Sequence, residues 1–123
     1  MPTKLLVVDD SKPIRDCLRG LLKSIAGVAS VAEAGTLAQA LQSAWFDPPT
    51  LVILDLRLPD GLAMQIIGTL KQISPKLRVA VLTIHADDGY RTQCLSLGAD
   101  WFFDKATEFE QLLDVVRQQA AFG

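Results

Sequence analysis

Leu51-Val52-Ile53-Leu54-Asp55 is the stretch that decides the fold, because four consecutive aliphatic residues end there at a carboxylate. A strand with apolar side chains on both faces is typical of parallel sheets that are covered by helices on both sides. A second stretch of this kind, Leu5-Leu6-Val7-Val8, ends at Asp9 and Asp10. The two stretches predict the interior of a sheet, and each leaves acids at its carboxyl end.

Outward from these two strands, strand patterns and helical patterns alternate along the whole chain. We expect further strands over 28–33, 77–83 and 101–103, and helices over about 11–27, 36–46, 62–73, 87–98 and from 109 onward. Five strands alternating with five helices predict an α/β fold with a doubly wound parallel sheet. Residues 1–123 contain no linker or repeat, so we expect a single domain.

Helix-capping residues and apolar spacing support these boundaries. Ser11 is expected to cap the first helix, and Thr107-Glu108-Phe109-Glu110 to form a capping box before the last. We expect Ile14 and Trp45 on the buried sides of their helices. Cys17 and Cys94 are expected to be buried, reduced thiols.

Composition excludes several classes of protein. The net charge is −2 and the basic residues are scattered, so we expect no direct nucleic-acid binding. Aliphatic runs are only as long as strands, so no membrane span is expected. The N-terminus leads directly into a strand and leaves no room for a signal peptide. These features predict a soluble cytoplasmic protein.

Reactive side chains follow four of the predicted strands: Asp9 and Asp10, Asp55, Thr83 and Lys105. Ligands of such sheets bind outside the carboxyl ends of the strands, so we expect these side chains to meet there. Two like charges about 4 Å apart cost about 4 kcal/mol at an effective dielectric near 20. A Mg²⁺ ion and the ammonium of Lys105 would offset that cost. The third carboxylate could then attack a phosphoryl group and form an aspartyl phosphate.

Five short motifs together resemble the receiver domains of response regulators, the family of two-component signalling. They are Val-Val-Asp-Asp-Ser at 7–11, Leu-Asp-Leu-Arg-Leu-Pro-Asp-Gly at 54–61, Val-Leu-Thr at 81–83, Gly-Ala-Asp at 98–100, and Lys105. Each motif is weak alone, but all five in order are highly specific. The resemblance covers 4–118 and implies a flavodoxin-like sheet of order 2-1-3-4-5.

The resemblance also implies a role for each site residue. Asp55 would be the phosphoacceptor, and Asp9 and Asp10 would bind Mg²⁺ together with Asp55 and the backbone carbonyl of Arg57. Thr83 would contact the phosphoryl group and Lys105 would pair with it.

The signal would leave the site through Thr83 and an aromatic switch residue, Phe102. Thr83 would move toward the phosphoryl group, and the ring of Phe102 would fill the vacated space. The surface made by the fourth helix, fifth strand and fifth helix would then change. The phosphoryl donor would be a histidine kinase or a histidine phosphotransfer protein, and the receiver of the signal a downstream protein or an appended output domain. Such a chain is no enzyme beyond its own phosphorylation and slow dephosphorylation.

Two residues depart from the commonest form of these motifs. Ile84 stands where a small residue is usual, and Ala106 where Pro is common, so we expect a trans peptide between Lys105 and Ala106. We hypothesise that Arg57, Ile84 and His85 crowd the phosphoryl site and slow the hydrolytic water. Ile84 could instead slow phosphorylation itself.

Several alternatives remain at this point. The chain could be a receiver detached from a longer DNA-binding transcription regulator, or a degenerate receiver. A haloacid-dehalogenase-like phosphatase would need Asp-x-Asp after its first strand, and a flavodoxin-like carrier a phosphate-binding loop there. Asp9 and Asp10 could also merely cap the first helix.

Overall fold

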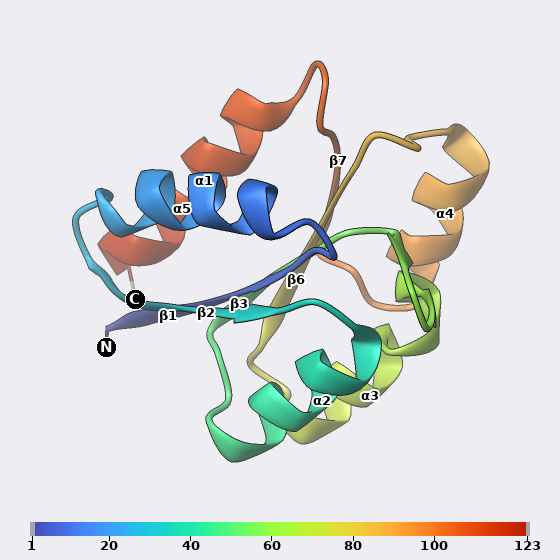
Figure 1. The fold of residues 1–123 in the computed structure, drawn as a ribbon, viewed down its shortest axis with the longest axis horizontal. Helices are drawn as coiled ribbons and strands as arrows, with labels where there is room; N and C mark the ends of the chain where they lie inside the picture. Colours follow the sequence, from blue (N-terminus) through green and yellow to red (C-terminus); the bar gives the residue numbers. More distant parts are fainter. Residues whose placement is uncertain (1, 123) are drawn as a thin grey trace.

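Five parallel strands form one sheet within residues 2–122, the part of the chain that this computed structural model describes (Figure 1). The strands are β1 (Thr3–Val8), β2 (Val28–Ala34), β3 (Leu51–Leu54), β6 (Arg78–Thr83) and β7 (Trp101–Asp104). Their order across the sheet is β2-β1-β3-β6-β7. Counted along the chain, these are strands 2-1-3-4-5, so the predicted doubly wound fold is confirmed.

Helices cover both faces of the sheet. The long helices are α1 (Lys12–Lys23), α2 (Leu37–Phe46), α3 (Ile67–Ile73), α4 (Asp88–Ser96) and α5 (Phe109–Phe122). Helices α1 and α5 lie together on one face, whereas α2 and α3 lie on the other, and α4 contributes to the core on that second face (Figure 1). No helix among residues 2–122 is long and apolar enough to cross a bilayer.

The apolar strands form two cores, one on each side of the sheet. Leu6 and Val8 of β1 belong to the core under α2, α3 and α4, and Leu5 and Val7 to the core under α1 and α5. All four side chains are at most 1% exposed. This two-sided burial is the physical reason that the strands carry uninterrupted aliphatic runs.

Side-chain caps fix where three of the helices begin. Ser11 accepts a hydrogen bond from the N–H of Ile14 at 3.4 Å, and Thr36 accepts one from Gln39 at 3.1 Å. Asp87 does the same for α4. Each bond satisfies an N–H group that the first helical turn leaves free.

The start of α5 differs from the prediction. Glu108, rather than Glu110, reaches back, and its Oε1 accepts the N–H of Asp104 at 2.9 Å. The carboxylate of Asp104 accepts the N–H of Ala106 at 2.9 Å. The turn between β7 and α5 is therefore held by Asp104 and Glu108, whereas the expected capping box used Thr107 and Glu110.

The segment after Asp55 contains structure that the sequence did not predict. Strands β4 (Arg57–Leu58) and β5 (Gly61–Leu62) form a small antiparallel hairpin, followed by the 3-10 turn η1 (Ala63–Gln65). Gly61 has φ +145°, a conformation that side chains disfavour. Within this hairpin, Asp60 accepts the N–H groups of Leu37 and Ala38 at 2.8 and 3.0 Å. The segment after Asp55 is thereby tied to the start of α2.

Three side chains are more exposed than predicted. Trp45 is 69% exposed, because the buried side of α2 is made by Leu37, Ala40 and Ala44. Ile14 is 37% exposed, and Cys17 is exposed as well, whereas Cys94 is buried as expected. The expected burial of these three residues was wrong, since the buried stripe of each helix is narrower than its apolar stripe.

Candidate functional site

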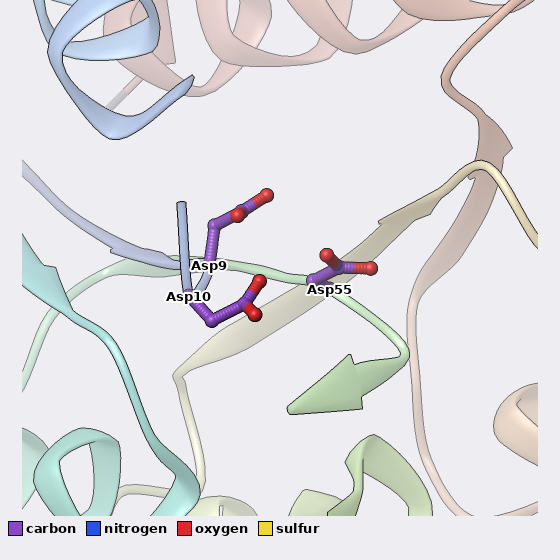
Figure 2. A group of neighbouring side chains, drawn as sticks. All are labelled: Asp9, Asp10 and Asp55. Carbon is purple, nitrogen blue, oxygen red and sulfur yellow. The ribbon is translucent and has the colours of Figure 1, made fainter. Parts of the chain in front are cut away.

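The two central strands bring Asp9 and Asp55 side by side. Val8 of β1 pairs with Leu54 of β3, so the residues that follow them are neighbours at the carboxyl edge of the sheet. The N–H of Asp55 donates to the carbonyl of Val8 at 2.9 Å, which extends the ladder by one bond. Figure 2 shows the carboxylates of Asp9, Asp10 and Asp55 gathered at this edge.

These three carboxylates form one cluster. An oxygen from each of Asp9, Asp10 and Asp55 lies within 4.8 Å of the other two. Asp9 is 3% exposed, Asp55 is half-buried and Asp10 is exposed. Burial raises the pKa of the Asp55 carboxyl above its ordinary value; the ammonium of Lys105 opposes that rise, and the charge of Asp9 adds to it.

Asp9 is the most firmly held of the three acids. One of its carboxylate oxygens accepts the N–H of Ser11 at 2.8 Å, and the other accepts Nζ of Lys105 at 3.1 Å. Its backbone carbonyl accepts a guanidinium N–H of Arg15 at 2.7 Å. The buried charge of Asp9 is therefore balanced by Lys105 and by the backbone N–H of Ser11, which is what burial of a carboxylate requires.

A hollow of about 310 Å³ opens beside the cluster. The three acids, Lys105 and the residues predicted to control access all line it. The full lining is Asp9, Asp10, Ser11, Ile14, Asp55, Arg57, Ile84, His85 and Lys105. Ser11 and Ile14 were expected to act only as a helix cap and a core residue. Both residues follow closely after the two acids, at the start of α1, and this position is the feature of the sequence that could have placed them at the site.

Thr83 and Phe102 are buried and do not line the hollow. Thr83 is fully buried at the end of β6, and its hydroxyl oxygen accepts the N–H of His85 at 3.0 Å. Phe102 is 3% exposed in β7, so its ring is buried. The movement predicted for this pair stays a prediction.

Sequence reasoning missed Arg91, which fixes Phe102 from α4. The guanidinium of Arg91 lies 5.1 Å from the centre of the Phe102 ring and donates to the Phe102 carbonyl at 2.9 Å. It also donates to Glu108 at 2.9 Å. One arginine therefore connects α4, β7 and the turn before α5, and no short motif in the sequence marks such a long-range contact.

The access residues have different surroundings. Ile84 is 67% exposed at the rim of the hollow. Arg57 donates to the hydroxyl of Tyr90 at 3.4 Å, with its guanidinium 6.0 Å from the centre of that ring. The contact extends Arg57 toward α4. The peptide between Lys105 and Ala106 is trans, as predicted.

The donor set of the cluster fits a hard divalent cation. Asp9, Asp10 and Asp55 offer only carboxylate oxygens, and these lie close enough together for one ion to reach all three. Mg²⁺ binds through one or two carboxylates and keeps several waters, and the exposed side of Asp10 leaves room for them.

Comparison with known proteins agrees with this geometry. The family model of the response regulator receiver domain matches residues 5–117. The chain belongs to the response regulator receiver family. Receivers are signalling domains rather than enzymes in the usual sense, and they generally bind Mg²⁺ at an acidic pocket. The comparisons give no support to the phosphatase alternative.

Relatives of this receiver include transcription regulators. It is 35% identical over 117 residues to the transcriptional activator protein ExaE of Pseudomonas putida, covering 95% of this chain and 55% of that protein. The receiver spans about half the length of the curated relatives it matches.

Solved structures of receivers superpose closely on this one. A response regulator of Burkholderia pseudomallei, solved with a phosphorylated aspartic acid, a calcium ion and citrate, has a TM-score of 0.82 at 28% identity and covers 97% of this chain and 69% of that one. The beryllofluoride-activated receiver domain of DrrB from Thermotoga maritima has a TM-score of 0.79 at 29% identity, with coverage of 96% and 97%.

Proposed function

We propose that this receiver takes a phosphoryl group onto Asp55 and transmits that event through Thr83 and Phe102. The observation that carries the proposal is the placement of Asp55 in the hollow, beside two further acids and the Lys105–Asp9 ion pair. The phosphorylated aspartate of the Burkholderia pseudomallei regulator supports the same chemistry. Residues 1–123 would act as one receiver domain.

The reaction would be a direct transfer between nucleophiles. One oxygen of Asp55 accepts the N–H of Leu56 at 2.7 Å, which leaves its other oxygen free to attack phosphorus. The new O–P bond forms as the P–N bond of a phosphohistidine breaks, and the electron pair of that bond stays on the imidazole nitrogen. The donor would be a histidine kinase or a histidine phosphotransfer protein.

Lys105 and Thr83 would serve the phosphorylated state. The ammonium of Lys105 has three N–H donors, so it can keep its bond to Asp9 and also donate to a phosphoryl oxygen. The hydroxyl of Thr83 accepts a bond from His85, so its own proton remains available for donation. Both residues would stabilise negative charge that is absent before phosphorylation.

Asp9, Asp10 and Asp55, with the backbone carbonyl of Arg57, would hold the Mg²⁺ ion. When bound, the ion supplies positive charge that offsets the crowded carboxylates and the phosphoryl group. The calcium ion in the Burkholderia pseudomallei regulator is consistent with a divalent site of this kind.

The output surface would be α4, β7 and α5. Phe102 lies in β7, and Arg91 of α4 joins it to Glu108 in the turn before α5. A downstream protein or an output domain would read this surface, and we place the receiver in the cytoplasm, where its thiols stay reduced. Phosphorylation would shift a pre-existing equilibrium between two arrangements of the surface.

Acetyl phosphate tests the assignment of Asp55 directly. In the presence of Mg²⁺, intact mass should show one added phosphoryl group in the wild type and none in Asp55→Asn. Asp16→Asn is the matched control, because Asp16 is an exposed acid of α1 that pairs with Lys12. Labelling of Asp55→Asn, or the absence of any Mg²⁺-dependent labelling in the wild type, would contradict the proposal.

A further inference from the structure

Two large aromatic side chains are exposed next to one another at the end of α2. Trp45 is 69% exposed and Phe46 is 78% exposed, the two highest values among the large apolar side chains of residues 2–121. An aromatic side chain buries about 150–250 Å² when it packs, so the pair leaves about 300 Å² of apolar surface in water. The largest apolar patch of a folded domain is commonly of this size and is often functional.

These aromatics border a groove between α2 and α3. The groove has a volume of about 420 Å³, and its lining comes from those two helices: Leu41, Gln42, Trp45, Phe46, Thr69, Gln72 and Ile73. Trp45 and Phe46 both line the groove and project from it. A projecting group and a hollow therefore lie on the same small patch.

The patch carries no charge. Helix α2 contains no charged residue, and the single charged residue of α3, Lys71, is paired with Asp100 at 2.6 Å. Asp47, directly after α2, is paired with Lys4 at 2.9 Å. Aromatic enrichment with depletion of charge is the composition of the buried centre of an interface.

We propose that this α2–α3 patch binds a second copy of the same chain. In a two-fold dimer the same patch faces itself, so the projecting aromatics of each copy can enter the groove of the other. An uncharged patch meets its own copy without like-charge repulsion, whereas it offers nothing to a partner that is recognised by charge.

The area available to this dimer is small. The two aromatics and their five neighbours can bury about 500–600 Å² per copy, or about 1,000–1,200 Å² in total. That total is at the lower limit for a specific interface, so the dimer is weak and reversible.

The patch is separate from the phosphorylation site. The aromatics lie at the end of α2, on the side of the molecule where the strands begin, whereas Asp55 follows the end of β3 (Figure 1). None of the residues of the patch lines the hollow beside Asp55. Dimerisation therefore does not depend on phosphorylation, and the proposal does not rest on the function proposed above.

Sedimentation equilibrium over a concentration series up to about 1 mM tests the proposal. The wild type should show a reversible monomer–dimer equilibrium, with the same dissociation constant in the presence and absence of beryllofluoride. Trp45→Ala should raise that constant at least about tenfold, as truncation of a central aromatic does. Gln72→Glu should raise it as well, because it places a charge of the same sign in both copies without removing apolar area.

Leu95→Ala is the matched control. Leu95 is 42% exposed on α4, away from the patch, so its loss should leave the dissociation constant unchanged. Circular dichroism will show whether each variant is folded. A wild type that stays monomeric at about 1 mM would overturn the proposal. So would a dimer that forms only with beryllofluoride, or one that Trp45→Ala and Gln72→Glu leave intact.

Discussion

Asp55 and Asp100 lie at opposite ends of the strands of the same sheet. Asp55 directly follows β3, and Asp100 directly precedes β7. Asp100 accepts bonds from Lys71 at 2.6 Å, from Arg78 at 3.2 Å and from the N–H of Val79 at 2.8 Å. Burial acts to raise the pKa of Asp100, but these donors outweigh it and the pKa is lowered.

Asp55, at the carboxyl ends of the strands, has the opposite shift of pKa. Asp55 accepts one backbone bond, from Leu56, and its neighbours Asp9 and Asp10 are acids. Its pKa is raised, first of all by burial. The two carboxylates differ in their hydrogen-bond donors. Asp100 has enough donors to stabilise its charge within the fold. Asp55 has fewer, so a cation or a bound group that supplies positive charge or donors would stabilise it.

Asp100→Ala should have the largest effect on stability. The variant leaves Lys71 and Arg78 without their carboxylate, and we expect the free energy of unfolding to fall by about 2–3 kcal/mol in urea titrations at pH 7. Because the pKa of Asp100 is lowered, this stabilisation is present above the ordinary Asp pKa of about 3.9 and is lost as the pH falls through the lower folded value. Asp16→Ala, which removes an exposed acid, is the control. An equal loss of unfolding free energy in this variant would show that the ion pairs of Asp100 contribute no more than an exposed pair.

Mg²⁺ should have the next largest effect, and only at the other edge. At a tenfold excess over its dissociation constant, a ligand of the folded state adds about 1.4 kcal/mol. Thermal unfolding at increasing Mg²⁺ concentration should show this rise in the wild type and in Asp16→Asn, and lose it in Asp10→Asn. If Asp10→Asn gained as much as the wild type, the cluster would not be the metal site.

Asp55→Asn should make the metal-free protein more stable, opposite in sign to the loss at Asp100. The variant removes a half-buried charge, so it relieves the cost of desolvation and the repulsion from Asp9, and these together outweigh the lost attraction to Lys105. We expect a gain of about 1 kcal/mol. The raised pKa means that the folded wild type loses stability as the pH rises from the ordinary Asp pKa through the folded value. The gain of Asp55→Asn in urea titrations should therefore be full at pH 7 and vanish in acid. A variant less stable than the wild type at pH 7 would show that the attraction to Lys105 and the bond from Leu56 outweigh the desolvation of Asp55 and its repulsion from Asp9.

Ile84→Ala should have the smallest effect and concerns access to Asp55. Ile84 is exposed at the rim of the hollow, so its truncation should shorten the half-life of the aspartyl phosphate, by less than about tenfold, if it slows the hydrolytic water. The half-life follows from intact mass after removal of acetyl phosphate, with Leu95→Ala as the control. An unchanged half-life would count against crowding by Ile84.

The fold was predictable because its decisive signal is local. The four aliphatic residues before Asp55 and the four before Asp9 indicate that both strands are buried on both faces. The alternation of strands with helices then predicts a parallel sheet. The acids of the cluster follow from the same rule, since parallel strands end at one edge. The sequence therefore predicts that Asp9, Asp10, Asp55 and Lys105 lie together.

What the sequence did not show depends on contacts between distant segments. Arg91 reaches Phe102 and Glu108 from another helix, and no short motif encodes that contact. Trp45 was expected to be buried from its spacing, yet smaller residues fill the contact between α2 and the sheet. Hydrophobic spacing identifies a helix, but the width of its buried side depends on the neighbouring helix.

The Lys105–Asp9 ion pair joins residues 96 positions apart in the chain. Contacts of such long sequence separation close late, because the loop between them must first be ordered. During synthesis, Asp9 and Asp55 emerge well before the lysine that balances them. The acidic edge can therefore reach its paired state only after β7 has docked, and a truncated or partly folded chain would carry its acids without the counter-charge that the pair supplies.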